Sequence, residues 1–166
     1  MEIHLIDAAT LVARLADALR TRAESVATAE SCTGGLVAAA CTSLAGSSEW
    51  FERGFVTYSN GAKAEMLGVA AALVDKHGAV SAEVACAMAD GAVARSRARH
   101  AVAVTGIAGP GGGSAAKPVG TVWIAVAAPS RATRATLLHA RGDRSAIRAA
   151  AVERALGLLL ESVESA

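Results

Sequence analysis

The sequence has few aromatic residues and almost no excess of either charge. Aromatic side chains make up 3% of the 166 residues, and the formal net charge is +1. Binding to DNA, RNA or an acidic membrane through the global field requires a clear excess of basic residues. The densest basic run, residues 95–99, is typical of a solvated helix end, where cations complement the helix dipole. We therefore expect neither nucleic acid nor a membrane as a partner.

Cysteine and long apolar runs are also scarce. The three cysteines, Cys32, Cys41 and Cys86, are odd in number and lack CxxC spacing, so the pattern predicts neither a disulfide framework nor a zinc site. No uncharged apolar run approaches the length of a membrane span, and the first residues do not have the pattern of a signal peptide. We expect a cytoplasmic protein that needs no metal and no cofactor.

Small and aliphatic residues dominate what remains. Hydrophobic residues make up 53% of the chain, with alanine prominent among them, and the length suits a single domain over residues 1–166. Alternation and helical periodicity predict strands at 25–29, 53–59, 100–105, 120–127 and 134–140, and helices at 10–22, 34–43, 62–67, 70–76, 82–97 and 145–163. This order predicts an α/β fold, a single layered domain with helices packed on a mixed parallel and antiparallel sheet.

The segment 29–35, Ala-Glu-Ser-Cys-Thr-Gly-Gly, is predicted to join the first strand to a helix through a glycine-containing turn. Such a turn leaves backbone N–H groups available for an anion or a developing oxyanion. Ser31 could project its hydroxyl there as a nucleophile, or Ser31 or Thr33 could simply cap the helix. We expect Thr33, Gly34 and Gly35 to supply oxyanion donors, with Glu30 among the substrate-binding residues.

A serine nucleophile needs a base, since its hydroxyl is protonated at neutral pH. The four histidines, His4, His77, His100 and His139, lie in segments that do not converge on Ser31. Lys63 is the better candidate, because a desolvated lysine has a lowered pKa and can accept a proton. Tyr58, at the next strand end, could orient Lys63 or relay a proton. Cys32 is a rival nucleophile, although no histidine partner is evident for it.

Residues 106–113 contain five glycines and one proline. Glycine at this density lets backbone N–H groups approach a phosphate or a ribose closely. The segment matches neither the P-loop pattern nor the dinucleotide-binding fingerprint. We interpret it as a ligand-binding loop rather than a connection alone, with Thr105, Gly106, Gly109 and Gly111 as candidate contacts.

Six ordered blocks carry a resemblance to a known family; they are residues 29–35, 55–60, 62–63, 78–81, 105–113 and 117–122. Together they resemble the CinA C-terminal domain family, the nicotinamide-nucleotide amidohydrolases of the PncC type. The resemblance implies hydrolysis of nicotinamide mononucleotide (NMN) to nicotinate mononucleotide and ammonia in pyridine nucleotide salvage, with Ser31, Tyr58 and Lys63 carrying the chemistry. On that basis the glycine-rich loop and Arg144 are candidates for the phosphate, although Arg144 could equally be a solvated residue at a helix end.

The sequence also leaves two alternative functions and one further partner open. A non-catalytic nucleotide-binding or scaffold module in a competence- or damage-linked role is the alternative function, and a deamidase for a related pyridine nucleotide or riboside is a third. The adjacent aromatic pair Trp50 and Phe51 could be exposed and could support a homo-oligomer.

Overall fold

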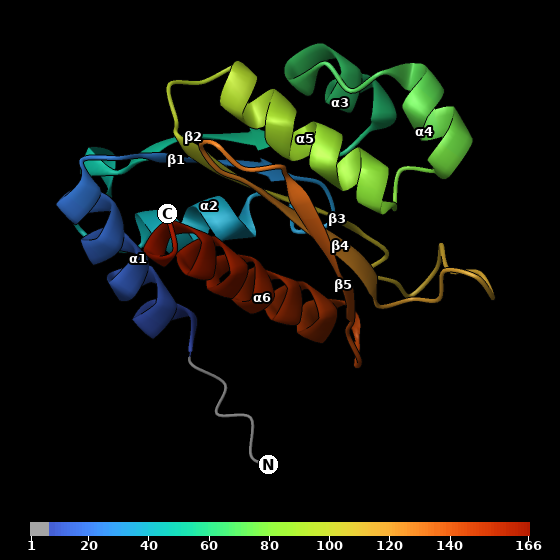
Figure 1. The fold of residues 1–166 in the computed structure, drawn as a ribbon. Helices are drawn as coiled ribbons and strands as arrows, with labels where there is room; N and C mark the ends of the chain where they lie inside the picture. Colours follow the sequence, from blue (N-terminus) through green and yellow to red (C-terminus); the bar gives the residue numbers. More distant parts are fainter. Residues whose placement is uncertain (1–6) are drawn as a thin grey trace.

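The computed structural model describes residues 7–166, so His4 lies outside the described residues. Twelve elements follow one another along this part of the chain: α1 (Ala8–Arg22), β1 (Val26–Glu30), α2 (Leu36–Thr42), the short 3₁₀ helix η1 (Ser47–Glu49), β2 (Phe51–Val56), α3 (Asn60–Leu67), α4 (Ala71–His77), α5 (Ala82–Ala94), β3 (His100–Gly106), β4 (Thr121–Ala127), β5 (Arg134–His139) and α6 (Arg144–Glu164). Figure 1 shows their arrangement.

The five strands form one sheet in the order β2-β1-β3-β4-β5. Helices α1, α2 and α6 lie on one face, and α3, α4 and α5 lie on the other (Figure 1). Each face has its own apolar core, one with Leu15 and Leu159 at its centre and the other with Met88 and Val84. Burial of these two faces stabilises the three-layer arrangement. The predicted α/β fold with a mixed sheet is confirmed.

Strand direction brings three chain segments to one edge. Strand β1 pairs in parallel with both β2 and β3, with Glu30 opposite Val56 on one side and Val104 on the other. The carboxyl ends of parallel strands meet at the same edge, where such sheets carry their ligands. Strands β4 and β5 continue the sheet as an antiparallel hairpin.

Several expected boundaries change. Helix α2 begins at Leu36 rather than at residue 34, because Gly34 and Gly35 adopt φ angles of +58° and +98° outside the helical range. Strand β2 covers Phe51–Val56, so Tyr58 lies beyond the strand end. The expected exposure of Trp50 is wrong, since this side chain is fully buried in the core on the α1 face. Homo-oligomerisation therefore loses the support of that residue and stays a prediction.

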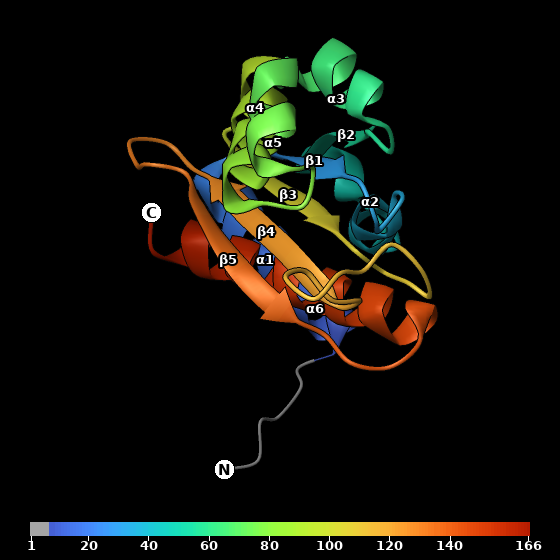
Figure 2. The same cartoon turned by 90° about the vertical axis from the view of Figure 1, so that its right-hand side faces the viewer.

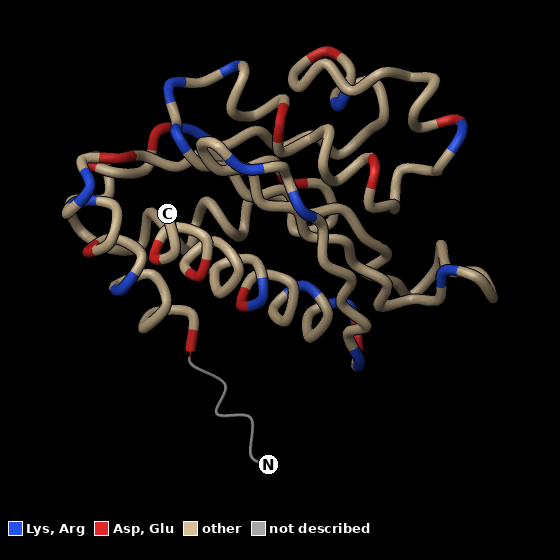
Figure 3. Tube along the Cα trace, viewed as in Figure 1, with Lys and Arg blue, Asp and Glu red and all other residues tan. Residues whose placement is uncertain are grey.

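Charges of both signs are interspersed along the described chain, which agrees with the near-neutral composition (Figure 3). None of the helices in residues 7–166 combines the length and apolar character that crossing a membrane requires.

Candidate active site

Hydrogen bonds of the sheet continue past the strand ends and position the candidate nucleophile. The N–H of Ser31 donates to the carbonyl of Val104 at 2.9 Å, which ties Ser31 to β3. The N–H of Thr57 donates to the carbonyl of Glu30 at 2.8 Å, which ties the segment after β2 to the end of β1. Ser31 is thus held by the backbone on a rigid element rather than on a free loop.

Lys63 lies between these two segments. Its Nζ donates to Ser31 Oγ at 3.1 Å and to the carbonyl oxygen of Thr57 at 3.1 Å. Helix α3 brings the lysine there because Ser59 caps the helix, accepting the N–H of Ala62 at 3.0 Å. Lys63 then occupies the first turn with its side chain directed inward, although a cation at this end opposes the helix dipole.

Burial makes Lys63 suited to act as a base. The residue is 1% exposed and forms no ion pair with a carboxylate among residues 7–166. Loss of hydration lowers the pKa of Lys63 from its ordinary value, against a smaller opposing effect of Cys32. A neutral amine within hydrogen-bond distance of a serine hydroxyl can accept its proton.

The buried environment of Cys32 does not favour this residue as the nucleophile. Burial raises the pKa of Cys32 to about 11, mainly through desolvation of the thiolate. The thiolate is the reactive form of cysteine. At neutral pH this side chain is therefore a protonated thiol packed in the core, and Ser31 is the better candidate.

The backbone N–H groups at the start of α2 already have an acceptor, the side chain of Glu30. Glu30 is 1% exposed, and its carboxylate accepts the N–H groups of Gly35 and Val37 at 3.0 Å and of Ala38 at 2.8 Å. Gly34 donates its N–H to the carbonyl of Ser31 at 3.0 Å. The expected substrate contact of Glu30 is thus replaced by capping of α2, and Gly34 and Gly35 have other acceptors.

Two N–H groups of the turn remain available. Those of Cys32 and Thr33 have no acceptor within the described part of the chain. Cys32 directly follows the candidate nucleophile Ser31, and Thr33 comes one residue later. Because a buried N–H is normally paired, these two groups replace Gly34 and Gly35 as candidate oxyanion donors, and Thr33 keeps its expected place.

Tyr58 contacts a different partner from the one expected. Its hydroxyl accepts a hydrogen bond from Arg144 Nη2 at 2.7 Å, while Nη1 of the same arginine donates to the carbonyl of Gly109 at 2.8 Å. Tyr58 is 58% exposed and is not hydrogen-bonded to Lys63. Arg144, the first residue of α6, therefore joins the segment after β2 to the glycine-rich loop. Figure 2 shows the loop after β3 passing close to the start of α6.

A cavity of about 300 Å³ opens onto this arrangement, lined by Ser31, Cys32, Tyr58, Asn60, Lys63, Ala79, Val80, Thr105, Gly106, Ile107, Ala108, Gly109, Gly111, Gly112 and Arg144. Three strand ends and the glycine-rich loop thus share one hollow. The Thr105 hydroxyl donates to the carbonyl of Ala79 at 2.8 Å, which ties β3 to the segment before α5 in the cavity wall, and its contact with a substrate stays a prediction. At Gly111 a Cβ would meet nothing within 4 Å, which leaves this part of the loop open to a ligand.

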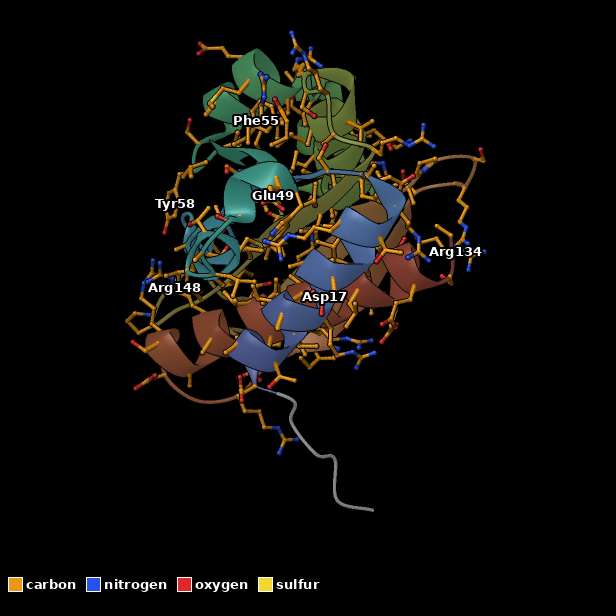
Figure 4. The ribbon with its side chains drawn as sticks, turned by 90° about the vertical axis from the view of Figure 1, so that its left-hand side faces the viewer. Asp17, Glu49, Phe55, Tyr58, Arg134 and Arg148 are labelled. Atoms are coloured by element: carbon orange, nitrogen blue, oxygen red, sulfur yellow. The ribbon has the colours of Figure 1, made fainter. Side chains whose placement is uncertain are left out.

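Sequence reasoning missed two residues of this region. Asn60 lines the cavity at the start of α3. Arg148 on α6 donates from Nε to the carbonyl of Cys32 at 3.1 Å and from Nη2 to that of Thr33 at 3.0 Å. Figure 4 shows Tyr58 and Arg148 on the same side of the molecule as α2. The spacing of Arg144 and Arg148, four residues apart on one helix face, was the available signal.

The described histidines lie elsewhere. His77 pairs with Glu83 at 3.4 Å and His100 with Glu24 at 2.7 Å, while His139 ends β5. None of the three lines the cavity. Among residues 7–166 there is no group of three histidine, cysteine or carboxylate side chains placed to hold a metal ion.

Fold and geometry together define an α/β protein with a serine–lysine pair at the carboxyl edge of its parallel strands. The model of the CinA C-terminal domain matches residues 8–163. The chain therefore belongs to the CinA C-terminal domain family, as the six sequence blocks predicted.

Curated relatives and solved structures agree with this assignment. The chain is 53% identical over 88% of both chains to the nicotinamide-nucleotide amidohydrolase PncC of Escherichia coli K12. It is also 53% identical to the protein of that name from Pseudomonas putida, covering 92% of this chain and 94% of the relative. The crystal structure of a competence/damage inducible protein from Agrobacterium tumefaciens superimposes with a TM-score of 0.91, at 48% identity over 97% of this chain and 98% of that one.

Proposed function

We propose that this protein hydrolyses the carboxamide of nicotinamide mononucleotide, giving nicotinate mononucleotide and ammonia in pyridine nucleotide salvage. The relatives from E. coli and P. putida, named nicotinamide-nucleotide amidohydrolases, support this activity. The observation that carries the chemistry is the 3.1 Å contact between Lys63 Nζ and Ser31 Oγ. A serine beside a buried lysine is a known variant of the serine–histidine–aspartate arrangement.

In the first half of the reaction, neutral Lys63 accepts the proton of the Ser31 hydroxyl. Ser31 Oγ attacks the carbonyl carbon of the carboxamide, and the carbonyl oxygen becomes an oxyanion held by the N–H groups of Cys32 and Thr33. Each such donor contributes about 2.7–4 kcal/mol in a well-studied protease. Collapse of the intermediate breaks the C–N bond, and the Lys63 ammonium gives its proton to the leaving nitrogen, which departs as ammonia.

The second half regenerates the enzyme. Water attacks the acyl ester on Ser31 while Lys63 again accepts a proton. The C–O bond to Ser31 breaks, Lys63 returns its proton to Ser31 Oγ, and the product acid releases its remaining proton to solvent as nicotinate mononucleotide leaves as a carboxylate. The carbonyl of Thr57, which also accepts from Lys63 Nζ, keeps the amine oriented in both halves. Side chains, backbone and water supply every step.

The phosphate of the substrate needs cationic or N–H partners, and the glycine-rich loop with Arg144 supplies both. Arg144 donates only to Tyr58 and to a loop carbonyl and forms no ion pair with a carboxylate among residues 7–166. The N–H groups of Gly109, Gly111 and Gly112 have no acceptor within the described chain. Guanidinium and loop amides of this kind are typical phosphate ligands.

Replacing the nucleophile tests the proposal. Ser31→Ala removes the attacking atom, and we expect ammonia release from NMN to fall by at least about 10³-fold, as for other serine nucleophiles. Thr42→Ala, an exposed hydroxyl on α2, serves as the matched control and should keep wild-type turnover. Ammonia is measured by a coupled assay, and the fold by circular dichroism. Wild-type turnover of the Ser31 variant would exclude Ser31 as nucleophile, and a wild-type protein that releases no ammonia would favour the binding-module alternative.

A further inference from the structure

Arg148 holds two successive carbonyl groups of the turn that follows the nucleophile. Its guanidinium donates to the carbonyls of Cys32 and Thr33 at 3.1 and 3.0 Å, across a sequence distance of more than 110 residues. It has no carboxylate partner among residues 7–166. In the described structure, both hydrogen bonds of the Arg148 guanidinium go to backbone carbonyls close to Ser31. Such contacts are unusual for an arginine whose only role is to stabilise the surface.

These contacts determine where the free N–H groups point. In a planar trans peptide the C=O and N–H bonds point in opposite directions, and the peptides of this turn are trans. Arg148 fixes the carbonyl of Cys32, so the N–H of Thr33 is directed away from the guanidinium. This N–H is one of the two in the turn without an acceptor in the described chain.

The second free N–H is fixed through a chain of peptides. Arg148 Nη2 holds the carbonyl of Thr33, whose peptide contains the N–H of Gly34. Gly34 donates that N–H to the carbonyl of Ser31 at 3.0 Å. The Ser31 carbonyl shares its peptide with the N–H of Cys32, a residue that lines the cavity. The N–H of the residue after the nucleophile is a recurrent oxyanion donor in other serine hydrolases.

We propose that Arg148 is a positioning residue that fixes the Cys32 and Thr33 N–H groups as the oxyanion donors of the Ser31 site. Glu30 complements this role, because its carboxylate occupies the N–H groups of Gly35, Val37 and Ala38. A developing oxyanion is therefore bound by N–H groups of the turn after Ser31 rather than by those at the start of α2. The inference deepens the proposed function and rests on it for the identity of the substrate, but not for the geometry of the turn.

Arg148→Met and Arg148→Lys test the role by kinetics. Loss of one oxyanion donor costs about 10²–10³ in kcat, and we expect Arg148→Met to lower kcat for NMN by about 10²-fold with KM within threefold. Arg148→Lys keeps the charge but lacks the planar fork that reaches two carbonyls. It should recover part of the loss and lie about tenfold below wild type. Arg154→Met, further along the same helix in an exposed 3.9 Å pair with Glu161, is the matched control and should leave kcat unchanged.

A second measurement does not need turnover. Pyridine-3-boronic acid can form a tetrahedral anionic adduct with a serine hydroxyl, and its affinity, measured by calorimetry, should fall in Arg148→Met by the same factor as kcat. The affinity for the product nicotinate mononucleotide should change less than threefold. A pure loss of stability would weaken both ligands alike, and Arg148→Lys provides a folded variant if Arg148→Met unfolds.

The outcomes separate the two proposals. An active wild type with an equally active Arg148→Met overturns the positioning role and leaves the proposed function intact. A wild type that releases no ammonia from NMN overturns the proposed function, while the boronate affinities still test Arg148. Equal boronate affinity in wild type and Arg148→Met, or no boronate binding to the wild type, overturns the inference.

Discussion

The two ends of the parallel strands differ in what faces their basic side chains. At the amino end, Glu24 accepts a 2.7 Å contact from the buried His100 and a 3.3 Å contact from Arg99. At the carboxyl end, Lys63 and the α6 residues Arg144 and Arg148 donate to hydroxyls or to backbone carbonyls, and these three have no carboxylate partner among residues 7–166. One end neutralises its charges internally and the other leaves them unneutralised.

This difference separates stability from function. A buried or half-buried cation without an anion, such as Lys63 or Arg148, costs free energy of folding, because its hydration is lost and no ion pair compensates. Such an arrangement is typical of sites where a ligand supplies the missing anion or where a lowered pKa is used in catalysis. The predictions below therefore assign loss of activity to the carboxyl end and loss of stability to the amino end.

The largest effect is expected from Lys63→Met. Without the base, kcat/KM for NMN should fall by about 10²–10⁴-fold. In the wild type, kcat/KM should rise with pH as Lys63 loses its proton, with a midpoint below the ordinary lysine pKa of 10.5, and the variant should lack this rise. Lys76→Met, an exposed lysine in the last turn of α4, is the control. A pH profile shared by wild type and Lys63→Met would identify another base.

Lys63→Met should also change how the free energy of unfolding depends on pH. The pKa of Lys63 is lowered in the folded protein, so the unfolded chain binds more protons between the lowered and the ordinary pKa. The free energy of unfolding of the wild type should therefore rise with pH across that interval. The Met variant lacks this term, and its stability relative to wild type should decrease from pH 7 to pH 10 in urea titrations. A constant difference would contradict the lowered pKa.

At the opposite end, Glu24→Gln should reduce stability and leave activity within twofold of wild type. Losing a hydrogen bond to a charged group costs about 1.5–3 kcal/mol. The hydrogen bond to His100 lowers the pKa of Glu24 in the folded protein, so its contribution is complete above the unfolded value near 4.5 and disappears as pH falls through the folded value. Stability differences from denaturant titrations should therefore shrink below pH 4.5.

The control for this prediction is Glu49→Gln, which removes an exposed ion pair with Arg20 and should cost less than about 1 kcal/mol. If Glu24→Gln lowered kcat as strongly as a change at the Ser31 end, the proposed separation of the two ends would be wrong.

The smallest effect is expected from Tyr58→Phe. The substitution removes the hydroxyl that accepts from Arg144 at 2.7 Å, so the arginine loses one restraint on its orientation toward the loop. We expect KM for NMN to rise about three- to tenfold with kcat within twofold, consistent with a modest exposed hydrogen bond. Steady-state kinetics decide the matter: a large fall in kcat together with an altered pH profile would restore the proton relay through Tyr58.

Local patterns were sufficient to predict much of the fold. An aspartate just before a helical pattern is a typical cap, and the Asp143 carboxylate accepts the N–H of Ala146 at 2.9 Å at the start of the last helix. Ser81 caps α5 in the same way. The convergence of the segments after β1, β2 and β3 followed from the rule that parallel strands end at one edge, and the contact of Lys63 with Ser31 agrees with that expectation.

The remaining features depend on contacts that sequence patterns do not encode. Arg148 contacts the turn after Ser31 from a helix more than 110 residues later in the chain, and no sequence pattern in either segment predicts this contact. Glu30 turns its carboxylate back to the start of α2, a choice of side-chain conformation rather than of residue type. Trp50 belongs to the core cluster that also contains residues of α1 and α6, which are distant in sequence, so its exposure could not be judged from its immediate neighbours.

The contacts of α6 with the nucleophile turn have a consequence for how activity is acquired during folding. Residues that form or support the site extend from Glu30 to Arg148, while α6 also packs along α1 near the start of the described chain. A nascent chain that still lacks α6 can pair β1, β2 and β3 but has no guanidinium to fix the turn. Full hydrolytic activity should therefore require the docking of α6, so its recovery on refolding reports when that helix has docked.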